Sequence, residues 1–333
     1  MAGEIHVVTG ASGHLGNVLV RTLSSKGARI RGLFRSPPSL DFPQDIEIAY
    51  GDICDASSLE NAFHHAERVY HVAGLVAIGG GARNSLHRVN VGGTQNVIRA
   101  CSRCNVKRLI YVSSIEAFDL SAKYIDANSP VRPDHTILEY GKSKALATLE
   151  VLTAAQSRAI DATVVFPTGF VGPHDYKLSP ISKLVADFYR RKVPAAASGG
   201  FDFVDVRDVA AGLIAAGEVG ANGSKYIMAG TYVTVRELFS ILQGLTGIAG
   251  PRFCIPRAAN CTVGLLAQAY SFLKNSQPRY TRKSLKLLSL GVSIDGAKAE
   301  KELGFRPRPI VESLRDTVGW LLSRGFLSGL ATG

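Results

Sequence analysis

The stretch Ile5–Gly16, with the sequence IHVVTGASGHLG, decides the fold of this chain. Its first four residues form a short, β-rich apolar run that predicts a strand, and Asn17–Leu23 places apolar residues at helical spacing. Between them, Gly10, Gly13 and Gly16 permit a tight turn, so that backbone N–H groups and a helix N-terminus can approach a pyrophosphate. The strand before this glycine cradle and the helix after it favour a nucleotide-binding loop over a turn that binds nothing.

Strand and helix patterns alternate through the first half of the chain. Further strands are predicted at 29–34, 46–52, 68–73, 108–112 and 162–166, and helices at 57–64, at 86–104 and around Tyr140. Such alternation predicts an α/β fold of the Rossmann type, a doubly wound parallel sheet with helices on both faces.

The alternation weakens after Pro167, although 226–229 predicts a late strand and 314–322 a final helix. We expect an NAD(P)-binding domain over residues 1–166, with strand and helix contributions from about 201–230. Residues 167–333 are then expected to form a smaller, mainly helical substrate-binding lobe. No Gly/Ser-rich linker divides the two.

The composition is that of a globular protein, because 46% of the 333 residues are hydrophobic and the net charge of +11 is scattered. There is no basic motif with interleaved aromatic residues, so nucleic acid is not an expected partner. There is also no leader-like segment and no apolar run of transmembrane length, so we expect a cytoplasmic protein without stable membrane insertion.

The cysteines are an odd, dispersed set that suits free thiols in a reducing compartment: Cys54, Cys101, Cys104, Cys254 and Cys261. Cys101-x-x-Cys104 has no second ligand pair nearby, which leaves zinc or redox chemistry as the lesser alternative. We predict no metal site.

The stretch EYGKSK at 139–144 contains Tyr140 and Lys144, two residue types that can act together as an acid/base pair. A free phenol has a pKa near ~10, too high for proton transfer at neutral pH. Lys144 lies one helical turn away, so its ammonium can share a face with the phenol and favour the phenolate. Alone, the pair could be a helix-surface contact, but the glycine cradle upstream favours catalysis.

The chain resembles the extended short-chain dehydrogenases/reductases of the NAD-dependent epimerase/dehydratase superfamily over nearly all its length. The matching motifs occur in the family's order: Gly10–Gly16, Asp52-Ile53, His71–Gly74, Asn90–Thr94, Ser113-Ser114, Tyr140-x-x-x-Lys144, Pro167–Pro173, Phe203–Asp208 and Leu303–Pro307.

The resemblance implies a role for each motif. Tyr140 would be the general acid in reduction and the base in oxidation, Ser114 would bond the reacting oxygen, and Lys144 would also hold the nicotinamide ribose. The remaining implied cofactor contacts are Gly10, Ser12, Gly13, His14, Leu15, Gly16, Arg35, Asp52, Ile53, Val72, Ala73, Gly74, Asn90, Ser113, Pro167 and Gly169. Asp52 and Ile53 would hold the adenine. Ser113 is either a cofactor contact or a plain strand end, and Asn90 either supports the nicotinamide or satisfies buried backbone groups.

The end of the second strand bears on the choice of cofactor. NAD enzymes of this fold commonly place an acid there for the ribose hydroxyls, but the run LFRSP at 33–37 has none before Asp41. Arg35 can pair with a 2′-phosphate and Ser36 can add a hydrogen bond. NADP(H) is therefore favoured over NAD(H), with a solvent-facing arginine as the alternative.

The segment after the sixth strand bears on the substrate. Nucleotide-sugar enzymes of the family usually carry an asparagine where this chain has Gly169. This stretch and the tail around 281–284 more closely resemble dihydroflavonol-4-reductase-like and 3β-hydroxysteroid-dehydrogenase-like members. The resemblance implies reduction of a ketone or aldehyde of a small, apolar or ring substrate, or oxidation of its alcohol. Phe170, Tyr176 and Phe201 are candidates for an apolar wall, or else core residues.

Alternatives stay open. A nucleotide-sugar epimerase or dehydratase with tightly bound NAD is the first, since the short interval from Ser114 to Tyr140 also occurs in those enzymes. A non-catalytic cofactor-sensing regulator is the second, although the retained Ser114, Tyr140 and Lys144 argue against it. The apolar segment 262–274 is expected to pack over the lobe or a partner, with membrane-surface contact as the minority alternative. By analogy with relatives, helices near 86–104 and 140–155 could pair in a homodimer.

Overall fold

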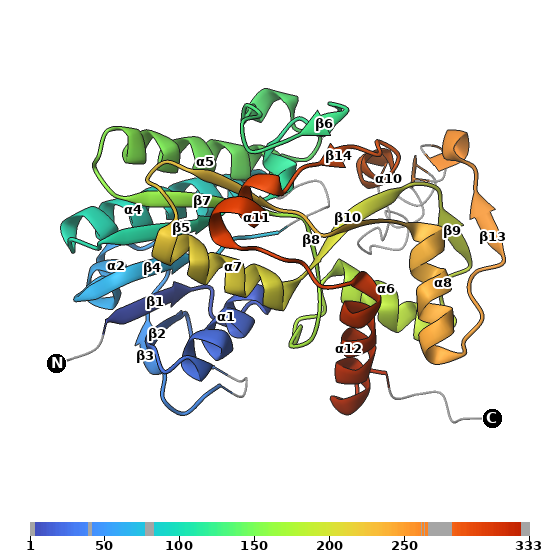
Figure 1. Ribbon diagram of the computed structural model, residues 1–333, viewed down its shortest axis with the longest axis horizontal. Helices are drawn as coiled ribbons and strands as arrows, with labels where there is room; N and C mark the ends of the chain where they lie inside the picture. The colour runs from blue at the N-terminus through green and yellow to red at the C-terminus, as the bar shows by residue number, and fades with distance from the viewer. Residues whose placement is uncertain are drawn as a thin grey trace.

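The computed structural model describes residues 4–38, 42–76, 83–260, 262, 264–265 and 282–327. Its centre is a seven-stranded parallel sheet with the order β11-β7-β5-β4-β1-β2-β3 (Figure 1). The strands are β1 (Ile5–Thr9), β2 (Arg29–Phe34), β3 (Glu47–Tyr50), β4 (Ala66–His71), β5 (Arg108–Val112), β7 (Ala162–Pro167) and β11 (Lys225–Met228). The predicted doubly wound sheet is confirmed. The direction of winding reverses between β1 and β4, and ligands of such sheets bind at the carboxyl ends of the strands at this point.

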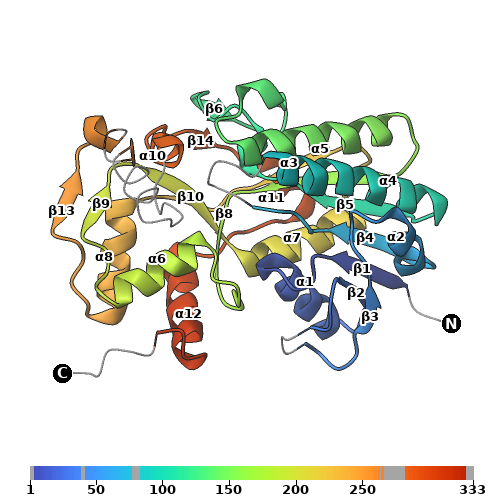
Figure 2. The same ribbon diagram turned by 180° about the vertical axis from the view of Figure 1, so that it is seen from behind.

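Helices cover both faces of this sheet (Figures 1 and 2). One layer contains α1 (His14–Ser25), α7 (Val206–Val219) and α11 (Ala297–Leu303), and the other contains α2 (Ala56–Phe63), α4 (Gly93–Arg103) and α5 (Glu139–Gln156). Successive residues of β1 alternate between the two layers, so Val7 and Val8 belong to separate apolar clusters. Burial on both faces explains why the strands are continuous apolar runs.

The helix predicted at 86–104 differs from the observed one. The observed segment consists of α3 (Arg83–Leu86), a π-helical turn (His87–Gly92) and α4. π turns often occur at functional sites, and this one carries Asn90, whose side chain reaches two other segments. The predicted strand at 46–52 is also shorter, at Glu47–Tyr50.

A second group of elements lies beside the carboxyl ends of the main strands (Figure 1). Its sheet has the order β12 (Thr231–Thr234), β10 (Gly200–Asp205), β8 (Gly169–Val171), and it packs on α6 (Pro180–Tyr189), α8 (Val235–Thr246) and α12 (Ile310–Ser323). Short parallel pairs join β9 (Ala195–Ala197) to β13 (Phe253–Ile255) and β6 (Tyr124–Ile125) to β14 (Ser293–Ile294). The remaining elements are α10 (Arg282–Leu288) and 3₁₀ turns at Ile115–Ala117, Pro133–His135 and Arg257–Ala259.

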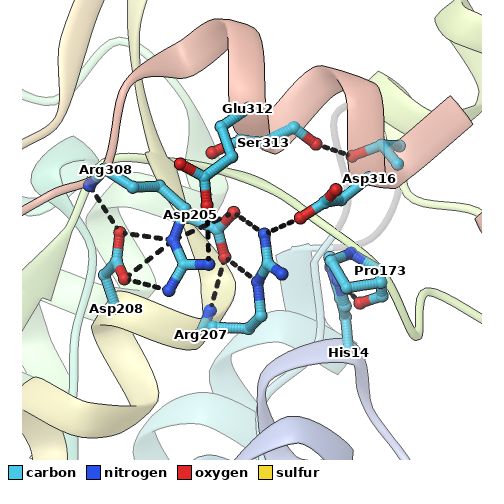
Figure 3. A network of polar contacts seen from close by, with 10 residues as sticks. His14, Pro173, Asp205, Arg207, Asp208, Arg308, Glu312, Ser313 and Asp316 are labelled. Carbon is cyan, nitrogen blue, oxygen red and sulfur yellow. Dashed lines mark hydrogen bonds and ion pairs between the residues drawn. The ribbon is translucent and has the colours of Figure 1, made fainter. Parts of the chain in front are cut away.

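An ion-pair network joins α7 to α12 and the segment before it (Figure 3). We call it the junction network: Asp205, Arg207, Asp208, Arg308, Glu312 and Asp316. The Asp205 carboxylate accepts hydrogen bonds from the backbone N and Nε of Arg207 at 2.8 and 2.9 Å. Arg308 donates from Nη2 and Nε to the two oxygens of Asp208, at 2.6 and 3.1 Å. These charge-assisted bonds fix the second group of elements against the main sheet.

Among the described residues, no helix is long and apolar enough to cross a membrane, and no group of His, Cys, Asp and Glu could hold a metal ion. Cys54, Cys101, Cys104 and Cys254 are free thiols. Burial raises the pKa of Cys101, so it is a poor nucleophile. Cys261 and most of the predicted 262–274 helix lie outside the described residues.

Candidate active site

The glycine cradle is packed too tightly for side chains. Gly10 has φ +72°, and a Cβ there would lie 2.7 Å from the backbone of Ala73 at the end of β4. A Cβ on Gly16 would lie 2.1 Å from the carbonyl oxygen of Gly10. Glycine at these positions lets α1 start directly against the ends of β1 and β4.

The N-terminus of α1 suits an anion. Gly13 is the N-cap of this helix, all of whose residues the structure describes. No side chain caps the helix, and its first turn contains no acidic residue. The N–H groups of that turn are therefore free of side-chain acceptors and carry the positive end of the helix dipole. The cradle fits a dinucleotide pyrophosphate.

Two predicted contact residues in the cradle direct their side chains elsewhere. Leu15 is buried in the core beneath α1. The Nε2 of His14 lies 2.9 Å from the carbonyl oxygen of Pro173, and its Nδ1 lies 4.0 Å from Asp175 (Figure 3). Burial lowers the pKa of His14, which favours the neutral ring. The hydroxyl of Ser12, by contrast, lies in the turn itself, 3.3 Å from Lys177 Nζ.

The predicted adenine side lies at the ends of β2 and β3. Arg35 is exposed just after β2. Burial and the Asp52 charge raise the pKa of Cys54, and the nearby Arg35 opposes this rise. Asp52 accepts a 2.9 Å hydrogen bond from Cys54 N, and Ile53 packs against Gly93 of α4. These residues therefore lie in one neighbourhood.

The N-terminus of α5 brings the catalytic candidates together. A Cβ on Gly141 would lie 2.3 Å from the carbonyl oxygen of Glu116, so α5 starts in close contact with the turn after β5. Ser114 caps that turn by accepting a 3.2 Å hydrogen bond from Glu116 N. Tyr140, in the first turn of α5, is half-buried beside this segment and hydrogen-bonds to Ser114.

Burial is the largest influence on the pKa values of Tyr140 and Lys144. It raises the pKa of Tyr140, the Glu116 charge raises it further, and the hydrogen bond to Ser114 only partly opposes them. Lys144 is buried; its Nζ donates to the carbonyl oxygen of Val112 at 2.6 Å and lies 4.4 Å above the Tyr111 ring. Burial lowers the pKa of Lys144 to about 7. The expected lowering of the Tyr140 pKa by Lys144 is thus not seen, because the phenol and the ammonium are both desolvated.

Glu116 is a further member of this site, and it was not predicted from the sequence. In the part of the chain that the structure describes, no group hydrogen-bonds its buried Oε2 atom. Burial raises the pKa of this carboxyl to about 7, so it titrates near neutral pH. Its position two residues after Ser114 is the only sequence signal. Together, Ser114, Glu116, Tyr140 and Lys144 form what we call the catalytic cluster.

Asn90 and Ser113 lie behind this cluster. The Asn90 amide accepts from Leu75 N at 2.7 Å and donates to Leu75 O at 3.0 Å and to Ser143 Oγ at 2.9 Å. Ser113 Oγ lies 2.7 Å from Thr148 Oγ1. Asn90 therefore satisfies backbone groups and Ser113 is tied to α5, while a contact of either residue with the cofactor stays a prediction.

The end of β4 reaches the cluster. Ala73 N donates to Thr9 Oγ1 at 3.2 Å, and Val72 is partly buried beside it. A Cβ on Gly74 would lie 3.3 Å from Asn90 Oδ1 and 4.0 Å from Lys144 Nζ. The predicted contacts at 72–74 therefore border both the glycine cradle and the catalytic cluster.

The segment after β7 packs against two rings that line an apolar cavity. Pro167 ends β7, and a Cβ on Gly169 would lie 3.0 and 3.1 Å from the rings of Phe203 and Phe201. Both rings line a cavity of about 80 Å³, whose other walls include Leu184, Leu238, Phe239 and Leu288.

The three aromatic residues proposed for a substrate wall differ in their surroundings. Phe201 lines the cavity. Phe170 packs edge-on against His14, with ring centroids 6.4 Å apart, and Tyr176 packs edge-on against Trp320 at 5.1 Å. Phe170 and Tyr176 therefore belong to the packing between elements.

Residues 6–229 match a family described as the NAD dependent epimerase/dehydratase family. Sterol demethylase protein B of Methylococcus capsulatus is 32% identical over 326 residues, covering 96% of this chain and 99% of that protein. A Synechocystis protein provisionally named dihydroflavonol 4-reductase is 30% identical over 330 residues, covering 96% and 95% of the two chains. Mouse short-chain dehydrogenase/reductase family 42E member 1 is 29% identical and covers 98% of this chain and 90% of that protein.

Solved structures share this architecture. The crystal structure of gox2253 superposes with a TM-score of 0.84 at 30% identity, covering 97% of this chain and 99% of that one. MoeE5 in complex with UDP-glucuronic acid and NAD superposes with a TM-score of 0.77 at 22% identity, covering 97% and 100%. At that identity, the likeness to MoeE5 concerns the fold alone.

Proposed function

Because the chain belongs to the NAD dependent epimerase/dehydratase family, we propose that it reduces a ketone or aldehyde to an alcohol, or catalyses the reverse oxidation. It is an NAD(P)-dependent oxidoreductase of the extended short-chain dehydrogenase/reductase type. The observation that carries the proposal is the meeting of Ser114 and Tyr140 beside the buried Lys144, with Gly74 linking this cluster to the glycine cradle.

The chain's own residues handle the proton. When bound, the reduced nicotinamide supplies the hydride that attacks the carbonyl carbon. Tyr140 donates its phenolic proton to the carbonyl oxygen, which becomes the alcohol, and Ser114 hydrogen-bonds this oxygen. The raised pKa of Tyr140 keeps the phenol protonated, the state that reduction requires. Lys144 would hold the nicotinamide ribose and, when protonated, favour the phenolate that proton donation leaves, which is then reprotonated from solvent.

We propose that the substrate is apolar. Gly169 has no side chain to donate to a diphosphate, and it adjoins the rings of Phe201 and Phe203, which line the cavity. Burying an apolar group there is favourable by about 25 cal/mol per Å². Relatives named sterol demethylase protein B and dihydroflavonol 4-reductase support a ring substrate bound by the lobe at 167–333.

The proposed cofactor is NADP(H) in preference to NAD(H). Arg35 is exposed at the end of β2, close to Asp52 and Cys54, where the 2′-phosphate of NADP would lie. A guanidinium can bind a phosphate in bidentate fashion.

A nucleotide-sugar epimerase or dehydratase is the second candidate. Glu116 favours it, because a partly buried carboxyl with a pKa of about 7 can move a second proton, which simple carbonyl reduction does not need. MoeE5, which is bound to a nucleotide sugar and NAD, shares the fold.

Location and assembly are part of the same proposal. The free cysteines suit the cytoplasm. A homodimer would pair α4 and α5 with those of a second copy, as relatives of this fold do. The only partner otherwise proposed is a small-molecule substrate.

The test supplies the purified protein with NADPH and, separately, with NADH. Each is mixed with pooled ring ketones and aldehydes or with pooled nucleotide sugars, while nicotinamide absorbance and products are followed together. We expect net consumption of NADPH with a ketone. A nucleotide sugar converted without net change in cofactor would replace the reductase with the second candidate.

A further inference from the structure

The segment Gly172–Ser179, which connects β8 to α6, has an unusual backbone. Gly172, His174 and Leu178 have φ values of +138°, +68° and +51°. Residues other than glycine adopt such values where their surroundings impose them. The contacts of this segment come from both the main sheet's helices and the second group of elements.

One anchor is His14, at the start of α1. Its ring contacts the carbonyl oxygen of Pro173 at 2.9 Å, as Figure 3 shows. A second anchor lies within the segment, where the Asp175 carboxylate, 2% exposed, accepts a 2.6 Å hydrogen bond from Ser179 N. A third is the Tyr176 ring, which packs on Trp320 of α12. The segment is therefore fixed at both ends, next to the glycine cradle.

Lys177 lies between these anchors. Its exposed side chain reaches back to the cradle, where Nζ donates to Ser12 Oγ at 3.3 Å, across 165 residues of sequence. Of all the residues that the structure describes, none forms an ion pair with Lys177. The ammonium thus faces a neutral hydroxyl at the positive end of the α1 dipole. Two positive features that face each other in this way are complementary to an anion with oxygens on several sides.

We propose that Lys177 binds the cofactor pyrophosphate from the 172–179 segment, so that this segment acts with the glycine cradle as a fixed clamp. This inference rests on the proposed function, because it requires a dinucleotide in the cradle. Ser12 belongs to the loop that approaches the pyrophosphate, whereas the 2′-phosphate belongs near Arg35 at the end of β2. Lys177 therefore contributes equally to the binding of NADH and NADPH.

The test measures equilibrium binding without turnover. NADH, NADPH and ADP-ribose are titrated by calorimetry into the full chain and into Lys177→Met, Lys177→Arg and Lys183→Met. Lys177→Met is expected to weaken all three ligands roughly tenfold, because one charge-assisted hydrogen bond is lost. Lys177→Arg keeps most of the affinity. Lys183→Met, which removes the same charge from an exposed position on α6, leaves it unchanged.

The outcomes separate this inference from the function on which it rests. If the unaltered protein binds the ligands and Lys177→Met binds them as tightly, the clamp is wrong and the proposed function stands. A loss confined to NADPH would also overturn the clamp, because it would place Lys177 at the 2′-phosphate. If the unaltered protein binds none of the three, both proposals fail. Equal thermal unfolding temperatures establish that the variants are folded.

Discussion

The catalytic cluster and the junction network both bury ionisable side chains, but they compensate the burial differently. In the cluster, the Lys144 ammonium donates to a carbonyl oxygen and lies over a ring, with no ion pair among the described residues, and Glu116 has a buried oxygen that no described group bonds. In the network, the Asp205 carboxylate, fully buried, is met by Arg207 and Arg308.

The pKa values follow this difference. In the cluster, burial moves the pKa of Lys144 and that of Glu116 to about 7, where each group can gain or lose a proton. In the network, burial alone would raise the pKa of Asp205, but the hydrogen bonds from Arg207 outweigh it and the pKa falls. Groups poised to titrate near neutral pH suit catalysis, whereas groups held in one charge state suit structure. The comparison thus predicts different consequences of mutation in the two regions.

Tyr140→Phe should have the largest effect. Removing the proton donor is expected to lower kcat/KM by roughly 10²–10⁴-fold, with little change in the free energy of unfolding. The matched control is Tyr70→Phe, which removes another buried hydroxyl, one that no described group hydrogen-bonds. Rates and denaturant unfolding are measured for both. Unchanged activity of Tyr140→Phe would remove Tyr140 from the mechanism.

Asp205→Asn should have the opposite effect, a loss of stability in place of a loss of activity. We expect it to lower the free energy of unfolding by about 2–4 kcal/mol, because two arginines lose a buried counter-charge. The lower end of this range allows for solvent at Arg207, whose side chain is 28% exposed. Asp316→Asn is the control, since it pairs with the same arginine but is 36% exposed and should cost less than about 1 kcal/mol.

The lowered pKa of Asp205 also makes the stability of the protein depend on pH. Its pKa is lower in the folded than in the unfolded chain, so its contribution is complete above the unfolded value of about 4. That contribution is lost as the pH falls through the folded value. The difference in unfolding free energy between the unaltered protein and Asp205→Asn should therefore shrink in acid. A difference that grows in acid would contradict the assignment.

Glu116→Gln should sharpen the view of the cluster. In the unaltered protein, the Glu116 charge raises the pKa of Tyr140. Without it that pKa falls, so reductase activity should be lost at a lower alkaline pH than in the unaltered protein. A pH profile of kcat/KM measures this shift, and Glu150→Gln on the exposed side of α5 is the control. Loss of all activity on every substrate at every pH would instead make Glu116 a proton donor in the reaction itself.

Arg35→Ala should have the smallest effect. It is expected to weaken NADPH roughly tenfold and to leave NADH unchanged, since only the 2′-phosphate contact is lost. Arg29→Ala, at the exposed beginning of the same strand, is the control. Equal affinity of Arg35→Ala for NADPH would remove the argument for NADP(H).

Local patterns sufficed for the main sheet and for placing the candidate site residues on their strands, turns and helices. Ile5–Thr9 and the glycines that follow it act through nearby residues, so their spacing alone predicts the strand, turn and helix. The spacing of Tyr140 and Lys144 likewise predicts one helix face. Most of the second group of elements was not predicted, because strands such as β8, with three residues, have no periodic pattern.

The features that the sequence did not reveal depend on distant contacts. Glu116 is partly buried, with its Oε2 atom inaccessible, because α5 starts in close contact with it at Gly141, and nothing in the run SSIEA indicates this. His14 turns from the cradle toward Pro173, 159 residues later. The pairing of Asp208 with Arg308 spans 100 residues. Such contacts follow from the tertiary arrangement and not from local spacing.

Isotope transfer tests the central claim most directly, namely that the catalytic cluster protonates a carbonyl oxygen while hydride arrives from the cofactor. NADPH carrying deuterium at both C4 positions is supplied with the ketone that the protein consumes, and the alcohol is analysed by mass spectrometry. We predict one deuterium on the carbinol carbon of each product molecule, and the same labelling at a much lower rate of product formation after Tyr140→Phe. An alcohol without deuterium on the carbinol carbon would contradict direct hydride transfer at this site.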